Sequence, residues 1–294
     1  MPKIISTSSL RFLIGLPLSF VLACDGGDPE EPNADGTDEG EDTGDTGESG
    51  DTDDDGDADD DGLSDEEEAE LGTDPNNVDT DGDTYWDSWE VAEGTDPLDP
   101  ESRIYYGYWP YYPDKDSLEQ GTWATASHSV NSQFPRATFT DQYGDEVEIY
   151  DFAMYTDNTT GAASYLIMDV AAQWCGPCHN IADWIAGNSD LLEDNYPTVR
   201  QKVRNRQAWW VTFVVQNVSG GPPTLADAET WADQHPDPNI PVFVDATQQV
   251  LDKYGSSQFP FFFLVDPVMG MEFWANADAN EDPFFALALV DMYL

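Results

Sequence analysis

The apolar residues of this chain are concentrated after residue 102, where short apolar runs alternate with segments of helical spacing. Runs rich in apolar and β-branched residues predict buried strands at 164–172, 210–216, 242–245, 261–266 and 272–275. Apolar residues three and four apart predict helices at 179–186, 226–235, 247–254 and 283–294, and two short runs predict a hairpin at 137–140 and 146–150. The alternation predicts an α/β domain over residues 134–294, with a mixed central sheet flanked by helices.

One further apolar run, from Phe12 to Ala23, lies between a charged start and a cysteine. It is too short to span a bilayer as a helix, so we predict that residues 1–23 are a secretory signal peptide. The ending Val21-Leu22-Ala23-Cys24 resembles the lipobox of bacterial lipoproteins, and by that resemblance Cys24 carries the lipid. An ordinary signal peptide with an incidental Cys24 is the alternative.

Charge divides the chain near residue 102. The 294 residues include 60 Asp and Glu against 10 Lys and Arg, and the formal net charge of −50 excludes a partner that binds through nucleic-acid phosphates. Of these acids, 34 lie between Asp25 and Glu101, where there is no Lys or Arg. Residues 24–50 contain almost no apolar side chains, and we therefore expect a disordered acidic tether.

An acidic pattern then repeats with a period of 22 residues. Each copy has acids at positions 1, 3, 5, 9 and 12 of a twelve-residue loop and offers a main-chain carbonyl at position 7. Hard oxygens in this number are the ligands that Ca²⁺ prefers, and a Glu at position 12 can bind it bidentately. The predicted calcium ligands are Asp57, Asp59, Asp61, the Leu63 carbonyl, Asp65 and Glu68 in loop one, and Asp79, Asp81, Asp83, the Tyr85 carbonyl, Asp87 and Glu90 in loop two.

These two copies resemble the bacterial thrombospondin type 3 repeat, and the resemblance covers residues 51–101. It implies units that wrap calcium ions with little other core. Loop two departs from loop one because Thr84 stands where loop one has Gly62 at the sharp turn, so we expect loop one to bind calcium more tightly. A partial third site at Asp51, Asp53 and Asp55 and, as the alternative, a plain acidic tail both remain open at this stage.

A pair of cysteines follows the first predicted strand of the α/β domain, in the order Cys175-Gly176-Pro177-Cys178. Because a helix is predicted after the pair, Cys175 stands at a helix N-terminus, where unpaired amide groups stabilise a thiolate. Cys178, one turn later, is expected to be buried and close enough to form a disulfide. The sequence therefore predicts a thiol–disulfide exchange centre in which Cys175 attacks and Cys178 resolves.

Trp174 to Cys178, with Phe259-Pro260 ahead of a later strand, resembles thioredoxin, and the leading hairpin is similar to the periplasmic TlpA-type redoxins. The resemblance implies a thioredoxin-like fold without an organic cofactor, a cis peptide bond at Pro260, and a role for Asp169 in accepting the proton of the resolving thiol. His179 completes a Cys-x-x-Cys-His pattern, which is also the attachment motif of c-type haem and leaves that alternative open. His179 is otherwise expected to tune the thiolate, while His128 and His235 are expected to be isolated surface residues.

Residues 102–133 form a connector that is dense in aromatic residues between 104 and 113. We expect this connector to pack on the redox domain, and a peptide-binding strip is the alternative. Together the segments predict a periplasmic or outer-membrane lipoprotein of the bacterial envelope whose partners carry thiols or disulfides. A calcium-binding surface or adhesion lipoprotein, with the thioredoxin-like domain as a structural module, is the rival hypothesis.

Overall fold

The structure is a computed structural model that describes residues 56–155, 162–255, 258–275 and 284–293. The chain divides into two units, residues 1–52 and 53–294, and the described residues all belong to the second. The predicted signal peptide, the lipidation site Cys24, the acidic tether and the partial site at Asp51, Asp53 and Asp55 therefore lie outside the described residues. Among the helices that are described, none is long and apolar enough to cross a membrane.

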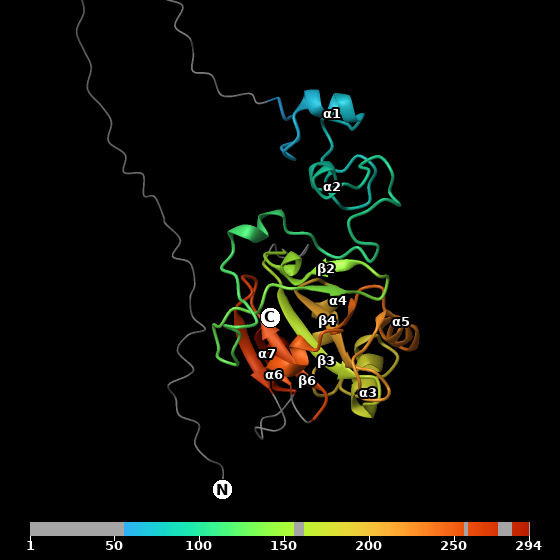
Figure 1. Cartoon of the computed structure of the whole chain (residues 1–294), viewed down its shortest axis with the longest axis vertical. Coiled ribbons are helices and arrows are strands. Elements are labelled where there is room, and N and C mark those ends of the chain that lie inside the picture. Colours follow the sequence, from blue (N-terminus) through green and yellow to red (C-terminus); the bar gives the residue numbers. More distant parts are fainter. Residues whose placement is uncertain (1–55, 156–161, 256–257, 276–283, 294) are drawn as a thin grey trace, which may run out of the picture. The chain divides into compact units, whose positions relative to one another are not determined.

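A seven-stranded mixed sheet forms the centre of the α/β domain predicted over residues 134–294, which we call the redox domain after its predicted Cys175–Cys178 exchange centre (Figure 1). Its strands are β1 (Thr138–Thr140), β2 (Glu146–Glu148), β3 (Tyr165–Ala172), β4 (Ala208–Gln216), β5 (Val242–Val244), β6 (Phe261–Val265) and β7 (Met271–Ala275), in the spatial order β2-β1-β5-β4-β3-β6-β7. The three central strands β5, β4 and β3 run parallel, and β1 and β6 join them antiparallel. The predicted α/β fold with a mixed central sheet is confirmed.

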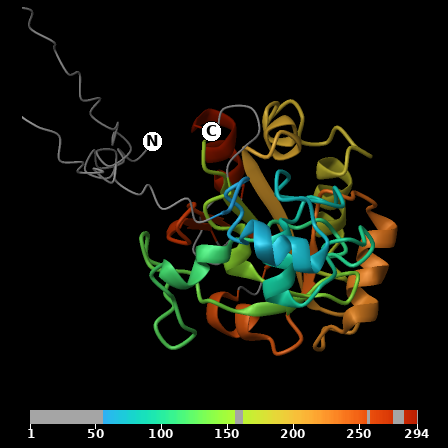
Figure 2. The same ribbon diagram turned by 90° about the horizontal axis from the view of Figure 1, so that it is seen from above.

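Helices cover both faces of this sheet (Figure 2). They are α3 (Gly176–Ile185), α4 (Val199–Arg204), α5 (Leu225–Gln234), α6 (Gln249–Tyr254) and α7 (Phe285–Tyr293), with a 3₁₀ turn η2 (Ile149–Phe152) after the hairpin. Apolar side chains of α3, α4 and α7 pack together with Ile167 of β3, while those of α6 and η2 pack with Met168. Since adjacent strand residues point to opposite faces, odd-numbered residues of β3 face α3.

The predicted elements are present, with ends that move by up to three residues, and the apolar pattern missed α4 and the two short helices of the repeats. Helix α4 has only two buried apolar residues, Val199 and Val203, so its apolar periodicity is too short to be recognised. Strand β4 begins at Ala208, two residues before the predicted start. Its second residue, Trp209, is buried in the same apolar cluster as the connector residues Tyr105 and Trp109.

Each calcium loop leads into a short helix. Loop one leads into α1 (Asp65–Leu71), and loop two leads into α2 (Asp87–Glu93). Ser64 and Glu67 form a capping box at the N-terminus of α1. The main-chain amide of Ser88 donates to Asp61 Oδ2 (3.0 Å), and the Ser88 hydroxyl donates to the Asp61 carbonyl (2.7 Å). These two bonds join loop one to the second repeat.

The connector packs on the redox domain, as expected, and contains one 3₁₀ turn, η1 (Pro113–Ser117). Tyr105 and Trp109 are buried in the core cluster beneath it. The Trp109 indole donates to Asp141 Oδ2 (2.6 Å), and the Tyr105 hydroxyl donates to Asp151 Oδ2 (2.7 Å). The hydroxyl of Tyr85, the position-7 residue of loop two, donates to the Trp109 carbonyl (2.8 Å), so the same core also anchors the second repeat.

Candidate functional site

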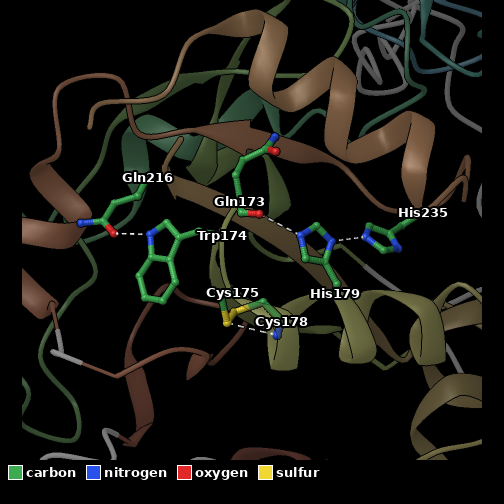
Figure 3. Close-up of a disulfide and its surroundings, with 7 residues drawn as sticks. All are labelled: Gln173, Trp174, Cys175, Cys178, His179, Gln216 and His235. Carbon is green, nitrogen blue, oxygen red and sulfur yellow. Dashed lines mark hydrogen bonds between the residues drawn. A yellow bond between two sulfur atoms is a disulfide. The ribbon is translucent and has the colours of Figure 1, made fainter. Parts of the chain in front are cut away.

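The redox motif lies where β3 ends and α3 begins (Figure 3). Cys175 and Cys178 form a disulfide, and Cys175 is the N-cap residue of α3. The amide of Cys178 donates to Cys175 Sγ at 3.2 Å. Pro177 occupies the first helical turn, where a missing N–H leaves no hydrogen bond unmade. The helix therefore presents its N-terminal amide groups to the Cys175 sulfur, which is the arrangement that stabilises a thiolate.

Aromatic residues and the predicted proline border the motif. Cys175 is only 3% exposed and Cys178 is fully buried, whereas Trp174 beside them is 48% exposed. The Trp174 ring meets the Phe259 ring edge-on at a centroid distance of 5.6 Å, and the next peptide bond, Phe259–Pro260, is cis as predicted. The structure thus packs Phe259, the residue before Pro260, against Trp174 and the cluster that contains both cysteines, although they lie far apart in the chain.

Gln216, which no sequence motif marks, also belongs to this border. Its side-chain oxygen accepts a hydrogen bond from the Trp174 indole at 2.9 Å (Figure 3). Gln216 comes to Trp174 because β4 pairs with β3 in parallel, with Gln216 opposite Ala172. No local motif marks such a contact, since it depends on strand register.

Asp169 lies in the middle of β3, fully buried, on the strand face that α3 covers. Neither of its carboxylate oxygens has a hydrogen-bond partner among the described residues. Burial raises the pKa of Asp169 to about 8. The predicted desolvated acid is therefore present, protonated near neutral pH, while its role as a proton acceptor stays a prediction.

His235 is not the isolated surface residue that the sequence suggested. It is half-buried, its Nε2 lies 2.7 Å from His179 Nδ1, and its Nδ1 lies 2.8 Å from Asp183 Oδ1. The other nitrogen of His179 lies 2.9 Å from the Gln173 carbonyl oxygen (Figure 3). Since both His179 nitrogens are engaged and both cysteines share a disulfide, this arrangement does not favour the haem alternative.

The calcium loops are built alike. In each loop the acids at positions 1, 3 and 5 bring ligand oxygens within 4.8 Å of one another. The two sets are Asp57, Asp59 and Asp61, and Asp79, Asp81 and Asp83. The position-6 amide donates to the position-1 carboxylate at 3.0 Å in both loops, from Gly62 in one and Thr84 in the other. Both position-6 residues have positive φ, 108° at Gly62 and 90° at Thr84.

Both loops also hold buried carboxylate oxygens without a hydrogen-bond partner among the described residues. They belong to Asp59 and Glu68 in loop one and to Asp81, Asp83 and Glu90 in loop two. Burial raises the pKa of each of these acids, and that of Glu90 to about 7. Unpartnered hard oxygens beside a carboxylate triad fit a calcium ion, because the ion supplies the charge that the buried acids lack.

The position-9 acids lie differently from the triads. Asp65 accepts a hydrogen bond from the Ala58 amide (3.0 Å), and Asp87 accepts one from the Thr80 amide (2.9 Å). Both donors occupy position 2 of their loop. The structure therefore gives these two predicted ligands a part in closing the loop, and their direct contact with calcium stays a prediction.

A family model matches the two repeats, and several solved structures are similar to part of the chain. Residues 51–78 and 79–100 match the family model of the bacterial TSP3 repeat. No curated protein matches the chain significantly. Among solved structures, the chain is similar to a protein from Chlorobium tepidum described as a thiol:disulfide interchange protein DsbE, with 19% identity and a TM-score of 0.37 over 56% of this chain and 99% of that one.

Two further solved structures are similar at the same level. One is the thioredoxin domain of a thiol-disulfide oxidoreductase from Bacteroides vulgatus, with 17% identity, a TM-score of 0.36, and coverage of 50% of this chain and 89% of that one. The other is MTB DsbF in mixed oxidised and reduced forms, with 12% identity, a TM-score of 0.36, and coverage of 56% and 99%. The chain thus combines two segments that match the TSP3 repeat with an α/β domain built on a seven-stranded mixed sheet.

Proposed function

We propose that the chain is a thiol–disulfide oxidoreductase of the bacterial envelope that exchanges disulfides with protein partners through Cys175 and Cys178. The observation that carries this proposal is the disulfide at the N-terminus of α3, with the Cys178 amide donating to Cys175 Sγ. A static bridge across a two-residue spacer would stabilise the fold little, since it closes a very short loop. The pair is therefore better explained by reactivity than by stability.

The arrangement supports a two-step exchange. In the reduced protein, the Cys175 thiolate attacks one sulfur of a partner disulfide, and the other partner sulfur leaves as a thiolate. The Cys178 thiol then loses its proton, for which the ionised form of the buried Asp169 is the proposed acceptor, and attacks Cys175 Sγ. The intramolecular disulfide forms and the partner leaves with two reduced sulfurs. Another dithiol must then reduce the Cys175–Cys178 bond, and the reverse sequence oxidises a partner.

The remaining parts of the chain fit a tethered enzyme. The lipobox-like ending at Cys24 suggests an anchor in the membrane, and residues 24–50 a flexible tether. The two repeats, once loaded with calcium, would stiffen the segment before the redox domain. The similarity to thiol–disulfide oxidoreductases and the bacterial type of the repeats favour an envelope location, with thiol- or disulfide-bearing envelope proteins as partners.

Insulin reduction by the full chain, with dithiothreitol as the electron donor, tests this proposal. The wild type should accelerate insulin precipitation, and Cys175→Ser should abolish the acceleration because no nucleophile remains. Cys178→Ser should instead accumulate a mixed disulfide with the partner, visible as a shift on a non-reducing gel. Cys24→Ser, the matched control, should reduce insulin at the wild-type rate. A wild-type chain that fails to reduce insulin, with ordinary thiols at both positions, would favour the calcium-binding scaffold hypothesis.

A further inference from the structure

Three hydrogen bonds in a row connect the redox motif to Asp183 through two histidines. His179 Nε2 lies 2.9 Å from the Gln173 carbonyl oxygen, and His179 Nδ1 lies 2.7 Å from His235 Nε2 (Figure 3). His235 Nδ1 lies 2.8 Å from Asp183 Oδ1. The series joins the loop before Cys175, the first turn of α3 and the C-terminal end of α5, of which His235 is the C-cap residue.

These three hydrogen bonds require three protons, whereas two neutral imidazoles carry only two. A carbonyl oxygen only accepts, so the proton between His179 and Gln173 belongs to His179 Nε2. The second proton lies between His179 Nδ1 and His235 Nε2 and can sit on either nitrogen, while the third lies on His235 Nδ1 and is donated to the Asp183 carboxylate. With all three protons the pair carries one positive charge, shared between His179 and His235, and with two protons one of the three hydrogen bonds is lost.

We propose that His179 and His235 are positioning residues for the redox motif, and that the proton they share favours the Cys175 thiolate. This inference rests on the proposed function only in requiring that Cys175 ionises and reacts. His179 lies four residues after Cys175, and its amide donates to the Cys175 carbonyl (3.2 Å). Side chains at this spacing on a helix are about 5–6 Å apart at Cβ, close enough for an added positive charge to stabilise a thiolate.

The surroundings of the pair hold it in place. The Trp231 ring of α5 stacks on His179 with a centroid distance of 4.6 Å. The Gln173 side chain donates to the Asp227 carbonyl, so the loop before Cys175 is fixed from α5 as well. Each contact limits the positions that the His179 ring can adopt, and the shared proton therefore acts from a defined place.

The carboxylate bonded to His235 is that of Asp183 on α3; Asp237 lines the same small cavity, and its Oδ1 accepts hydrogen bonds from Asn239. Burial lowers the pKa of His235 below the ordinary histidine value, while the hydrogen bond to Asp183 opposes that shift. The shared proton therefore leaves on the acidic side of neutrality. The thiolate-favouring form of the pair is the one present at mildly acidic pH.

The pH dependence of Cys175 alkylation in the reduced full chain tests the proposal. Iodoacetamide labelling would be followed by peptide mass spectrometry, which separates Cys175 from Cys24 and Cys178. At mildly acidic pH, His179→Gln should label Cys175 about three- to tenfold more slowly than wild type, because one positive charge near the sulfur is lost. At alkaline pH the two should label alike. His128→Gln, the matched control on another part of the domain, should follow the wild-type profile.

A second measurement keeps the inference separate from the proposed function and from any folding defect. His235→Gln should give the same loss as His179→Gln, and the double variant no greater loss, because both remove one shared proton. In wild type, histidine NMR titrations should move to higher pH when the disulfide is reduced, since proton and thiolate stabilise each other reciprocally. Equal midpoints in both redox states, or a wild-type alkylation profile in His179→Gln, would overturn the inference. If insulin is not reduced but the midpoints move, the proposed function fails and this inference stands.

Discussion

The redox domain and the calcium repeats both bury carboxyl groups, but they place them among different neighbours. Asp169 stands alone on β3, fully buried, with two unpartnered oxygens. Glu68 and Glu90 are buried to the same degree, but each closes a loop that already holds three aspartates. A lone buried carboxyl group can be neutralised by one proton, whereas adjacent carboxylates are neutralised together by a divalent cation. The neighbours of a buried acid, rather than its burial, therefore indicate its chemistry.

The redox domain and the repeats also differ in what stabilises them. The redox domain contains three clusters of buried apolar side chains on the two faces of its sheet. The repeats contribute Tyr85 as their fully packed aromatic side chain, and α1 and α2 have seven residues each and no basic residue in the last turn. Helices this short are not stable by themselves. The redox domain should therefore respond to pH through Asp169, and the repeats to calcium.

The largest expected effect comes from Asp169→Asn. Burial raises the pKa of Asp169 from 3.8 to about 8, so the folded protein keeps a proton that the unfolded chain loses as the pH rises. Wild-type stability from this group is fully present below pH 3.8 and declines up to about pH 8. At about 1.4 kcal/mol per pH unit, the variant should be about 4 kcal/mol more stable at pH 7 and equal at pH 3.5. Urea unfolding at several pH values, in calcium and in EDTA, measures this.

Asp233→Asn is the control, because Asp233 is an exposed acid on α5 of the same domain and should change little at any pH. In the exchange reaction, Asp169→Asn should slow the release of the mixed disulfide more than the first attack, if the carboxylate accepts the Cys178 proton. A variant with unchanged pH dependence of unfolding would show that Asp169 is solvated, and the comparison with the repeats would no longer hold.

The second largest effect is that of Glu90→Gln on stability, and its sign should depend on whether calcium is bound. Glu90→Gln removes a buried carboxylate with an unpartnered oxygen, so in EDTA the variant repeats should melt at a higher temperature than wild type. In calcium at 100 times the dissociation constant, the variant should lose about 2.7 kcal/mol, the stabilisation from one bound ion. Circular dichroism melts of the full chain measure its stability in EDTA and in calcium, and calorimetric titration measures the binding of calcium. Glu70→Gln, an exposed acid on α1, should show neither change. Destabilisation in EDTA as well would assign Glu90 a structural role without calcium.

Much of this comparison could be predicted from the sequence because its signals are local. The strand, the Cys175–Cys178 pair and the following helix are adjacent in the chain, and so are the acids of each loop. The apolar run around Asp169 predicted a buried strand, whereas the interest of Asp169 itself came from the resemblance to thioredoxin.

The contacts that could not be predicted join elements far apart in the chain. His179 meets His235 across 56 residues because α3 and α5 lie side by side, and Trp174 meets Gln216 through the register of β3 with β4. Tyr85 joins the connector through its hydroxyl, whereas its position in the loop indicated only a carbonyl ligand. Side-chain pairing of this kind depends on helix placement and strand register, which apolar periodicity leaves open.

The smallest predicted effect concerns the difference between the two loops. Thr84 has a φ of 90°, a left-handed conformation that a β-branched residue adopts at a cost, while Gly62 at the same position adopts 108° freely. We expect bound calcium to require this conformation, whereas the calcium-free loop would be able to relax from it. Thr84→Gly should therefore raise the calcium affinity of loop two by about fivefold, equivalent to about 1 kcal/mol.

The reverse change, Gly62→Ala, should lower the calcium affinity of loop one. The added Cβ would meet nothing nearer than Ser88 at 3.9 Å, so the backbone conformation alone would be responsible for the loss. Two-site calorimetric titration of the variants separates the loops, and unequal affinities that survive both substitutions would mean that the acids, not the turn residue, set the difference.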